Sequence, residues 1–301
     1  MAINSNVRIA YKFWSDLNAF LSITSESGNM LASNLQNHQP SSIWRSTTAA
    51  AQHFVMDFGG LKKVTFICLY NHNFSYNAVI KLHIGLDADV VNYYGLGEGG
   101  LGQTILGVPD NVYSYTFNAV KGFYAIGQGK LGMVRLGGYS DEAIYMPFSL
   151  LWLPDENVLG SYAKLSILDT TNPDGYIQCG RLLLGEHWSP SFNFEPGQSI
   201  KRVTNSKQLI MDNGATRANR LASYREISLS LKNITYLESP IIDEMCNLVD
   251  LDKNVLISVY PGVGTTEETL NTMLAFFTDW SETTRDTLCQ RSFNFKAREA
   301  K

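Results

Sequence analysis

The chain has 301 residues, a formal net charge of −4 and a charged fraction of 17%, which is below the usual quarter. This length allows two domains with separate cores, and the acidic balance leaves no basic stripe for binding nucleic acid. No apolar stretch approaches 18 residues and no signal peptide is visible, so we expect no membrane insertion.

The first part of the chain alternates like a β-sandwich. In residues 52–59, Phe54, Met56 and Phe58 share one face of a predicted strand. Residues 64–73 are apolar almost throughout, which is typical of a strand covered on both sides. Residues 78–84 alternate again, with the apolar side chains on one face. We therefore predict an antiparallel sandwich.

A glycine-rich insertion follows at about residues 86–149. Twelve of the chain's 24 glycines lie between Gly95 and Gly138. Because glycine loses the most backbone entropy on ordering, this stretch predicts long loops and short hairpins. Loops of this length in a compact fold usually contact a partner.

Two motifs in this insertion resemble ligand sites but lack the required context. Residues 95–100 match Gly-x-Gly-x-x-Gly, yet Pro109 stops the helix that a dinucleotide site needs, so a flexible loop is favoured. Asp87, Asp89 and Glu98 could ligate calcium, but they show no recognisable ligand order, and we favour solvated carboxylates. We predict no metal and no cofactor.

The aromatic residues of the loops are the candidates for binding. Flat aromatic faces suit the apolar side of a sugar ring, and the same side chains could instead anchor a core or an interface, which we favour. The candidates are Trp44, Tyr93, Tyr94, Tyr113 and Tyr115.

The sandwich resumes with predicted strands at residues 150–153 and 162–168. A turn at residues 172–175, Asn-Pro-Asp-Gly, leads into a closing strand at residues 176–185. The four cysteines lack any C-x-x-C spacing and read as small buried hydrophobic residues, which favours synthesis in a reducing compartment.

The last part of the chain has a different pattern. A half-buried strand at residues 226–232 precedes a helix at about residues 240–251, with Ser239 as the N-cap and Pro240 at the first helical position. An apolar strand follows at residues 255–260. Thr265 to Glu268 could form a capping box for a short helix, but we favour a loop and a strand at residues 273–277. The final strand, residues 292–298, alternates clearly.

Two parts of the sequence resemble proteins of bacteriophage and prophage tails. Residues 41–46, Ser-Ser-Ile-Trp-Arg-Ser, and the two strands after them resemble the galactose-binding (discoidin-like) jelly roll carried by such tail proteins. Residues 180–193 are similar to a tail-tip pattern in which a Gly-Arg-Leu strand leads to an aromatic residue, a proline and an asparagine. The following strand–helix–strand block resembles the tail-tube fold of distal tail (baseplate hub) proteins.

These resemblances imply a mainly β chain in two domains. Residues 1–185 would form the galactose-binding-like jelly roll, and residues 186–301 a smaller tail-tube-like β domain with one flanking α-helix. Distal tail proteins commonly place the ring-forming domain first, whereas here the sandwich is expected to precede the tube-like block.

The function implied is that of a minor tail protein in the virion, made in the host cytoplasm. It would form a ring of identical subunits at the distal end of the tail and dock other tail-tip or tube proteins. The alternative is a carbohydrate-binding module that recognises a host surface glycan.

Catalysis is not indicated by the residues. The five histidines show no zinc spacing, and no Gly-x-Ser-x-Gly elbow supports a hydrolase triad. A glycan-degrading enzyme would need a paired-carboxylate cleft, which the sequence does not show. We therefore predict that the chain is not an enzyme.

Overall fold

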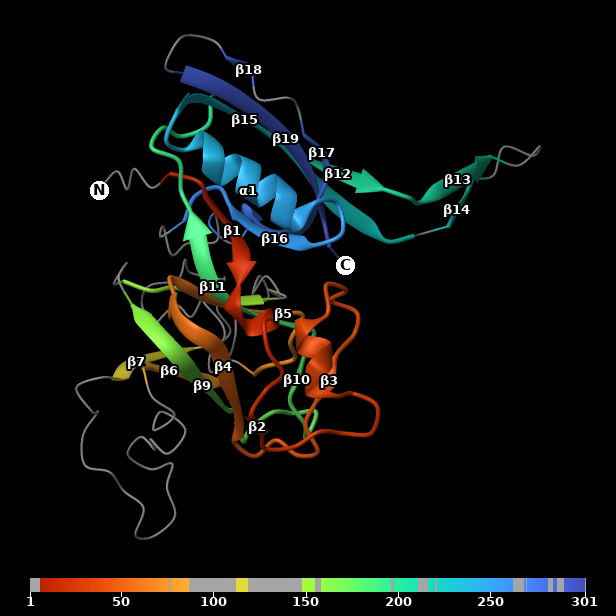
Figure 1. The fold of residues 1–301 in the computed structure, drawn as a ribbon. Coiled ribbons are helices and arrows are strands. Elements are labelled where there is room, and N and C mark those ends of the chain that lie inside the picture. The colour runs from red at the N-terminus through yellow and green to blue at the C-terminus, as the bar shows by residue number, and fades with distance from the viewer. Residues whose placement is uncertain are drawn as a thin grey trace, which may run out of the picture. The chain divides into compact units, whose positions relative to one another are not determined.

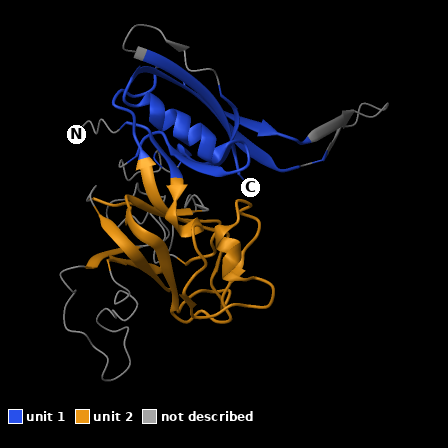
Figure 2. Ribbon diagram, in the orientation of Figure 1, with its two compact units in different colours: residues 1–11, 188–263, 267–301 blue, residues 12–187, 264–266 orange. Residues whose placement is uncertain are grey.

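The computed structural model describes residues 6–75, 77–86, 112–118, 148–154, 158–195, 198–210, 216–219, 221–261, 268, 270–280, 284–285 and 290–300. The chain is mainly β, as predicted, and its α-helix α1 covers Ser239–Val249 (Figure 1). It divides into two compact units (Figure 2). The sandwich unit comprises residues 12–187 with 264–266, and the helix-flanked unit comprises residues 1–11, 188–263 and 267–301.

The sandwich unit is built from two groups of antiparallel strands. One sheet has the order β2 (Ser22–Ile23), β4 (Gln52–Lys63), β9 (Leu159–Leu168), β6 (Val79–Gly85) and β7 (Val112–Asn118). The other group has the order β11 (Arg181–Trp188), β5 (Phe66–Tyr70) and β8 (Phe148–Trp152). A short ribbon pairs β3 (Trp44–Arg45) with β10 (Gln178–Cys179), and two 3-10 helices, η1 (Trp14–Asp16) and η2 (Ala32–Gln36), complete the unit.

The core of this unit lies between the two groups of strands. Phe54, Met56 and Phe58 of β4 enter it together, as their alternation predicted. All five residues of β5 are buried, which confirms a strand covered on both sides. The alternating face of β6 enters the same core through Ile80, Leu82 and Ile84.

The closing strand of the sandwich differs from its prediction. Residues 176–185 were expected to form one strand, but β10 and β11 are separated at Gly180. A Cβ at Gly180 would lie 2.2 Å from the carbonyl oxygen of Pro40, so only glycine allows this close approach of the backbone. The preceding turn is confirmed, since Gly175 has a φ of 74° and donates to the carbonyl of Asn172.

The helix-flanked unit has one antiparallel sheet covered by a helix. Its strand order is β12 (Ser199–Thr204), β15 (Ser223–Thr235), β19 (Gln290–Glu299), β17 (Thr272–Trp280), β16 (Asn254–Ser258) and β1 (Arg8–Phe13), with β18 (Thr284–Arg285) beside β19. Ile242, Met245 and Val249 of α1 (Ser239–Val249) pack into the core with alternate residues of these strands. In the part of the chain that the structure describes, no helix has the length and hydropathy needed to cross a bilayer.

A two-stranded hairpin continues β12 and β15 beyond this sheet. It consists of β13 (Lys207–Ile210) and β14 (Thr216–Asn219), which pair with each other in a separate sheet.

The final predicted strands are confirmed: β17 covers residues 273–277, and Phe293, Phe295 and Ala297 of β19 are buried together. Most of the capping-box segment lies outside the described residues, but Glu268 and Leu270 are helical, so the favoured loop is wrong there and the short helix fits better.

The helix begins one residue earlier than predicted. Its N-cap is Glu238 rather than Ser239, and Pro240 occupies the first turn. The hydroxyl of Ser239 is buried and accepts a hydrogen bond from Arg291, so it does not cap the helix.

The first eleven residues change the expected domain order. They were expected in the jelly roll, but Arg8, Ile9 and Ala10 pair with Ser258, Ile257 and Leu256 of β16 in the helix-flanked unit. Val7, Ile9 and Tyr11 alternate into the core of that unit. The sandwich unit is therefore inserted between Tyr11 and Trp188, and does not simply precede the other unit.

Candidate binding site

Trp44 occupies the core of the sandwich unit. Its side chain is fully buried, its ring meets that of Phe54 edge to face with centroids 4.7 Å apart, and its indole N–H donates to the carbonyl of Ser25 at 3.1 Å. No face of the indole is left for a sugar ring. For this residue the favoured interpretation, a core anchor, is the one that fits the structure.

Two of the other predicted aromatic residues, Tyr113 and Tyr115, lie among the described residues, on strand β7. Tyr113 on β7 is 41% exposed, and Tyr115 is partly buried against the sandwich core. Tyr93 and Tyr94 lie outside the described residues, as do the Gly95–Gly100 motif and the acidic residues 87, 89 and 98. Among the candidates that the structure describes, Tyr113 on the edge strand β7 is the one with an exposed side chain.

A polar cluster that the sequence did not indicate surrounds the β3–β10 ribbon. The guanidinium carbon of Arg45 lies 4.1 Å from the ring centroid of Tyr176, in cation–π contact. Nη2 of Arg45 also donates to Oε1 of Gln178 at 3.1 Å. Arg45, Tyr176 and Gln178 are each partly exposed, and together with Asn73 and Asp174 they are called the Arg45 cluster.

Asn73 fixes the shape of this cluster. Its amide nitrogen donates to Oδ2 of Asp174 at 2.8 Å and to the carbonyl of Tyr176 at 3.1 Å. Its amide oxygen accepts the backbone N–H of Gln178 at 2.8 Å. One planar side chain thus connects the 172–175 turn, the residue after it and strand β10.

The buried carboxylate of Asp169 stabilises the same turn through hydrogen bonds. Asp169 accepts the backbone N–H of Ser75 at 2.8 Å, the amide of Asn172 at 2.9 Å and the hydroxyl of Ser75. Asp169 is almost fully buried, while Asp174 is exposed. The turn is therefore held in place by Asp169, and the carboxylate of Asp174 remains open to solvent.

The cluster offers donors and acceptors on planar groups. Within the described residues, Nε of Arg45 is buried and has no hydrogen-bond partner. An N–H donor without an acceptor is costly, but this atom has too little accessible surface for a ligand oxygen to reach it. The groups of the cluster that solvent can reach include the carboxylate of Asp174, which can accept a hydrogen bond from a hydroxyl. Among the described residues, no group of histidine, cysteine or acidic side chains could hold a metal ion.

This cluster could not be found from residue types alone. Arg45 adjoins Trp44 in the sequence, and Asp174 belongs to the predicted turn. These two distant segments are brought into one cluster by the pairing of Trp44 with Cys179 and of Arg45 with Gln178. A two-residue ribbon gives no periodic signal in the sequence, so its register was not predictable.

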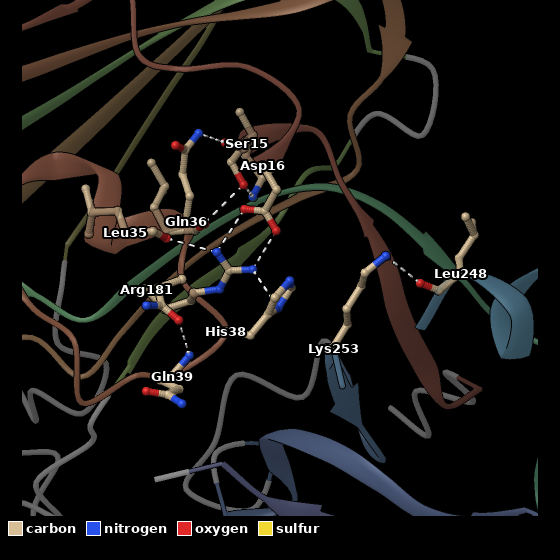
Figure 3. A network of polar contacts seen from close by, with 12 residues as sticks. Ser15, Asp16, Leu35, Gln36, His38, Gln39, Arg181, Leu248 and Lys253 are labelled. Carbon is tan, nitrogen blue, oxygen red and sulfur yellow. Dashed lines mark hydrogen bonds and ion pairs between the residues drawn. The ribbon is translucent and has the colours of Figure 1, made fainter. Parts of the chain in front are cut away.

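Arg181 forms a second polar network, which is structural. Its fully buried guanidinium donates to both carboxylate oxygens of Asp16, at 2.8 and 2.5 Å, and to the carbonyl of Leu35 at 3.1 Å. His38 lies beside the same group (Figure 3). Burial raises the pKa of Asp16 above its ordinary value, while the charge of Arg181 acts against that rise. The network fastens η1 and η2 to β11.

The hydrogen bond between the buried side chains of His72 and Ser149 runs in the wrong direction to activate the serine as a nucleophile. Nδ1 of His72 accepts the backbone N–H of Phe74 at 3.3 Å, so in the neutral ring Nε2 carries the proton and donates to Oγ of Ser149, 2.8 Å away. Burial lowers the pKa of His72 to about 3. A base for Ser149 would need an unprotonated Nε2, so this pair does not activate the serine.

Comparisons with known proteins give structural likenesses to the sandwich. No family model and no curated protein matches the chain. Its structure is similar to a fucose-binding module of Streptococcus pneumoniae, with 8% identity, a TM-score of 0.34, and 58% of this chain and 98% of that chain covered.

Two further likenesses are of the same extent. Chitosan-binding module 1 of a chitosanase/glucanase from Paenibacillus sp. IK-5 has 13% identity and a TM-score of 0.36, with 58% of this chain and 99% of that chain covered. XRCC1, solved bound to the DNA polymerase β catalytic domain, has 13% identity and a TM-score of 0.35, with 56% and 95% covered. At these TM-scores the likenesses carry no inference about what this chain binds.

Proposed function

We propose that the sandwich unit is a carbohydrate-binding module and that the Arg45 cluster contacts the sugar. The observation that carries this proposal is the pre-arranged set of planar polar groups on the β3–β10 ribbon, where the partly exposed Arg45 lies over the ring of Tyr176 and donates to Gln178. Adjacent hydroxyls of a sugar both donate and accept, which suits a cluster that offers both a guanidinium and an exposed carboxylate.

The proposed role is binding without catalysis. The cluster is held by hydrogen bonds that fix its members in place, as a binding site requires. The buried His72–Ser149 pair lacks the protonation state of a nucleophile and its base. Both points support a module that recognises glycan on a host surface and does not cleave it.

Glycan-array binding with the full chain tests this function. We expect Arg45→Ala and Tyr176→Ala each to weaken binding of the selected glycan by about tenfold or more, since each removes a direct contact. Arg202→Ala is the matched control, because Arg202 is an exposed arginine on β12 of the other unit. No bound glycan, or binding unchanged by Arg45→Ala, would contradict the proposal.

The same array separates this site from the outer strand. Tyr113→Ala removes the exposed aromatic ring on β7. We expect it to leave glycan binding unchanged. Loss of binding with Tyr113→Ala but not with Arg45→Ala would move the sugar site to β7.

Assembly into a phage tail tip is the second candidate function. It rests on the helix-flanked unit, whose strand–helix–strand block is accompanied by the β13–β14 hairpin. In this proposal the chain forms a ring of identical copies in the virion and docks other tail-tip proteins. Mass photometry and negative-stain imaging would show the ring, while a strict monomer that is absent from purified virions would contradict it.

A further inference from the structure

Asp169 is a buried acidic side chain beside the Arg45 cluster. It directly follows β9, is 1% exposed, and accepts hydrogen bonds from three uncharged donors. Two of these donors are the backbone N–H and the hydroxyl of Ser75, and the third is the amide of Asn172. Burying a carboxylate among uncharged donors costs free energy that an apolar side chain would not. A role other than stability would explain an acidic residue at this position.

The carboxylate fixes the orientation of the Asn172 side chain. A carboxylate only accepts hydrogen bonds, so the group of Asn172 that points at Oδ2 of Asp169, 2.9 Å away, is the amide nitrogen. The same nitrogen donates to the carbonyl of Asn73 at 3.1 Å, which is a second acceptor. The side-chain oxygen of Asn172 is therefore directed away from Asp169.

That oxygen holds Asp174, a member of the Arg45 cluster. Oδ1 of Asn172 accepts the backbone N–H of Asp174 at 3.0 Å. Asp174 is also held at its side chain, where Oδ2 accepts from the amide nitrogen of Asn73 at 2.8 Å. Because its backbone N–H and one carboxylate oxygen are both fixed, the exposed side chain of Asp174 has a defined direction.

A chain of hydrogen bonds therefore runs from the interior of the sandwich unit to its surface. This chain, called the Asp169 relay, passes from Asp169 through Asn172 to Asp174. Each link has one direction, because a carboxylate only accepts and a backbone N–H only donates. Fully satisfied polar networks are rigid, and a rigid site loses less entropy when its ligand binds.

We propose that Asp169 is a positioning residue of the sugar site and that it acts through Asn172 on the carboxylate of Asp174. Asp169 itself is buried and does not contact the sugar. It holds Asp174 where that carboxylate accepts a hydrogen bond from a sugar hydroxyl. This inference deepens the carbohydrate-binding function proposed above and rests on it.

Three full-chain variants test the relay through the affinity for the glycan selected on the array, measured by isothermal titration calorimetry. Asp169→Ala removes the carboxylate and Asn172→Ala removes the amide, so we expect each to raise the dissociation constant about tenfold. Asp169→Asn is the conservative variant, because its amide oxygen can still accept from Ser75 and Asn172. It should stay within about twofold of wild type.

Ser75→Ala is the matched control. It removes one donor to Asp169, but the Ser75 hydroxyl is not on the path from Asp169 to Asp174. We therefore expect it to lower the melting temperature, followed by circular dichroism, and to leave the dissociation constant unchanged. A loss of stability alone lowers the calorimetric stoichiometry and not the affinity of the folded fraction, so a merely structural role of Asp169 would leave the affinity unchanged.

A double-mutant cycle tests whether the effect passes through Asp174. Asp174→Ala removes the carboxylate that the relay positions. We expect Asn172→Ala to cause no further loss of affinity in the Asp174→Ala background. A further loss as large as that in wild type would overturn the inference. This cycle needs no variant of Asp169, so it decides the question even if Asp169→Ala does not fold.

Hydrogen exchange at the backbone N–H of Asp174, measured by NMR, follows the relay without a ligand. We expect this exchange to be faster in Asp169→Ala and Asn172→Ala than in wild type, because both variants release the acceptor of that N–H. Asp169→Asn and Ser75→Ala should exchange as wild type does. Equal exchange in all five proteins would show that Asp169 does not position Asp174.

The outcomes separate the positioning role from the binding function. A wild type that binds no glycan, or that binds it equally after Arg45→Ala, overturns the binding function and the positioning role with it. Binding that is lost in Arg45→Ala but unchanged in Asp169→Ala and Asn172→Ala overturns the positioning role alone.

Discussion

At residue 181, the sandwich unit buries a whole guanidinium against a carboxylate that is 20% exposed. Arg181→Ala would leave Asp16 as a largely buried charge without its partner, which we expect to cost about 3 kcal/mol in the free energy of unfolding, at the lower end for buried pairs. We expect urea denaturation to show a loss of this size. The double variant Asp16→Leu/Arg181→Met is the control, because it removes both charges and should recover most of the stability. A double variant as unstable as Arg181→Ala would contradict this account.

At residue 72, burial makes the stability depend on pH. The folded state keeps His72 neutral down to a pKa of about 3, whereas the unfolded chain takes up a proton near pH 6.5. The stability from His72 is therefore complete above pH 6.5 and declines as pH falls toward 3. From pH 7.5 to 5.0 we expect a loss of about 2 kcal/mol, at 1.36 kcal/mol for each pH unit below 6.5.

The variant His72→Asn checks which group is responsible. Its amide oxygen can accept the N–H of Phe74, as Nδ1 of His72 does, but it does not titrate. Urea denaturation at the two pH values should therefore show a smaller loss in His72→Asn than in wild type. An equal loss in both proteins would assign the pH dependence to other groups.

At the scale of single elements, the strands with alternating apolar residues were predictable from the sequence, but the pairing of strands that are far apart in the chain was not. The buried faces of β4 and β19 follow from a period of two that is visible in the sequence. Strand β1 was missed although Val7, Ile9 and Tyr11 also alternate, because its partner β16 lies about 250 residues away in the chain. The Arg45 cluster was missed for the same reason, since the register of β3 with β10 is a tertiary property.

Gly185 in β11 lies so close to the backbone of Lys12 that no larger residue fits at this position. A Cβ at Gly185 would lie 1.9 Å from the carbonyl oxygen of Lys12, a backbone atom that cannot move without displacing the chain. We expect Gly185→Ala to lower the free energy of unfolding by about 3 kcal/mol or more, at the upper end of overpacking effects. Gly160→Ala is the comparison, because its nearest contact is a side-chain methyl, Cγ2 of Ile84, at 2.4 Å, and its nearest backbone atom, the carbonyl oxygen of Gly85, is 3.1 Å away. Equal costs for the two variants in urea denaturation would contradict this explanation.

At the scale of the whole molecule, the chain has two hydrophobic cores with separate memberships, and residues 1–11 belong to the helix-flanked unit. Ile9→Ala should therefore cost about 2–5 kcal/mol and increase hydrogen exchange in β16 and α1, while β4 and β6 keep their protection. Leu165→Ala, which removes an equally buried side chain from the sandwich core, should do the reverse. Hydrogen exchange followed by mass spectrometry resolves these strands separately. If each variant increased hydrogen exchange equally in both units, the two units would unfold as one. The insertion of the sandwich after Tyr11 would then not separate their stabilities.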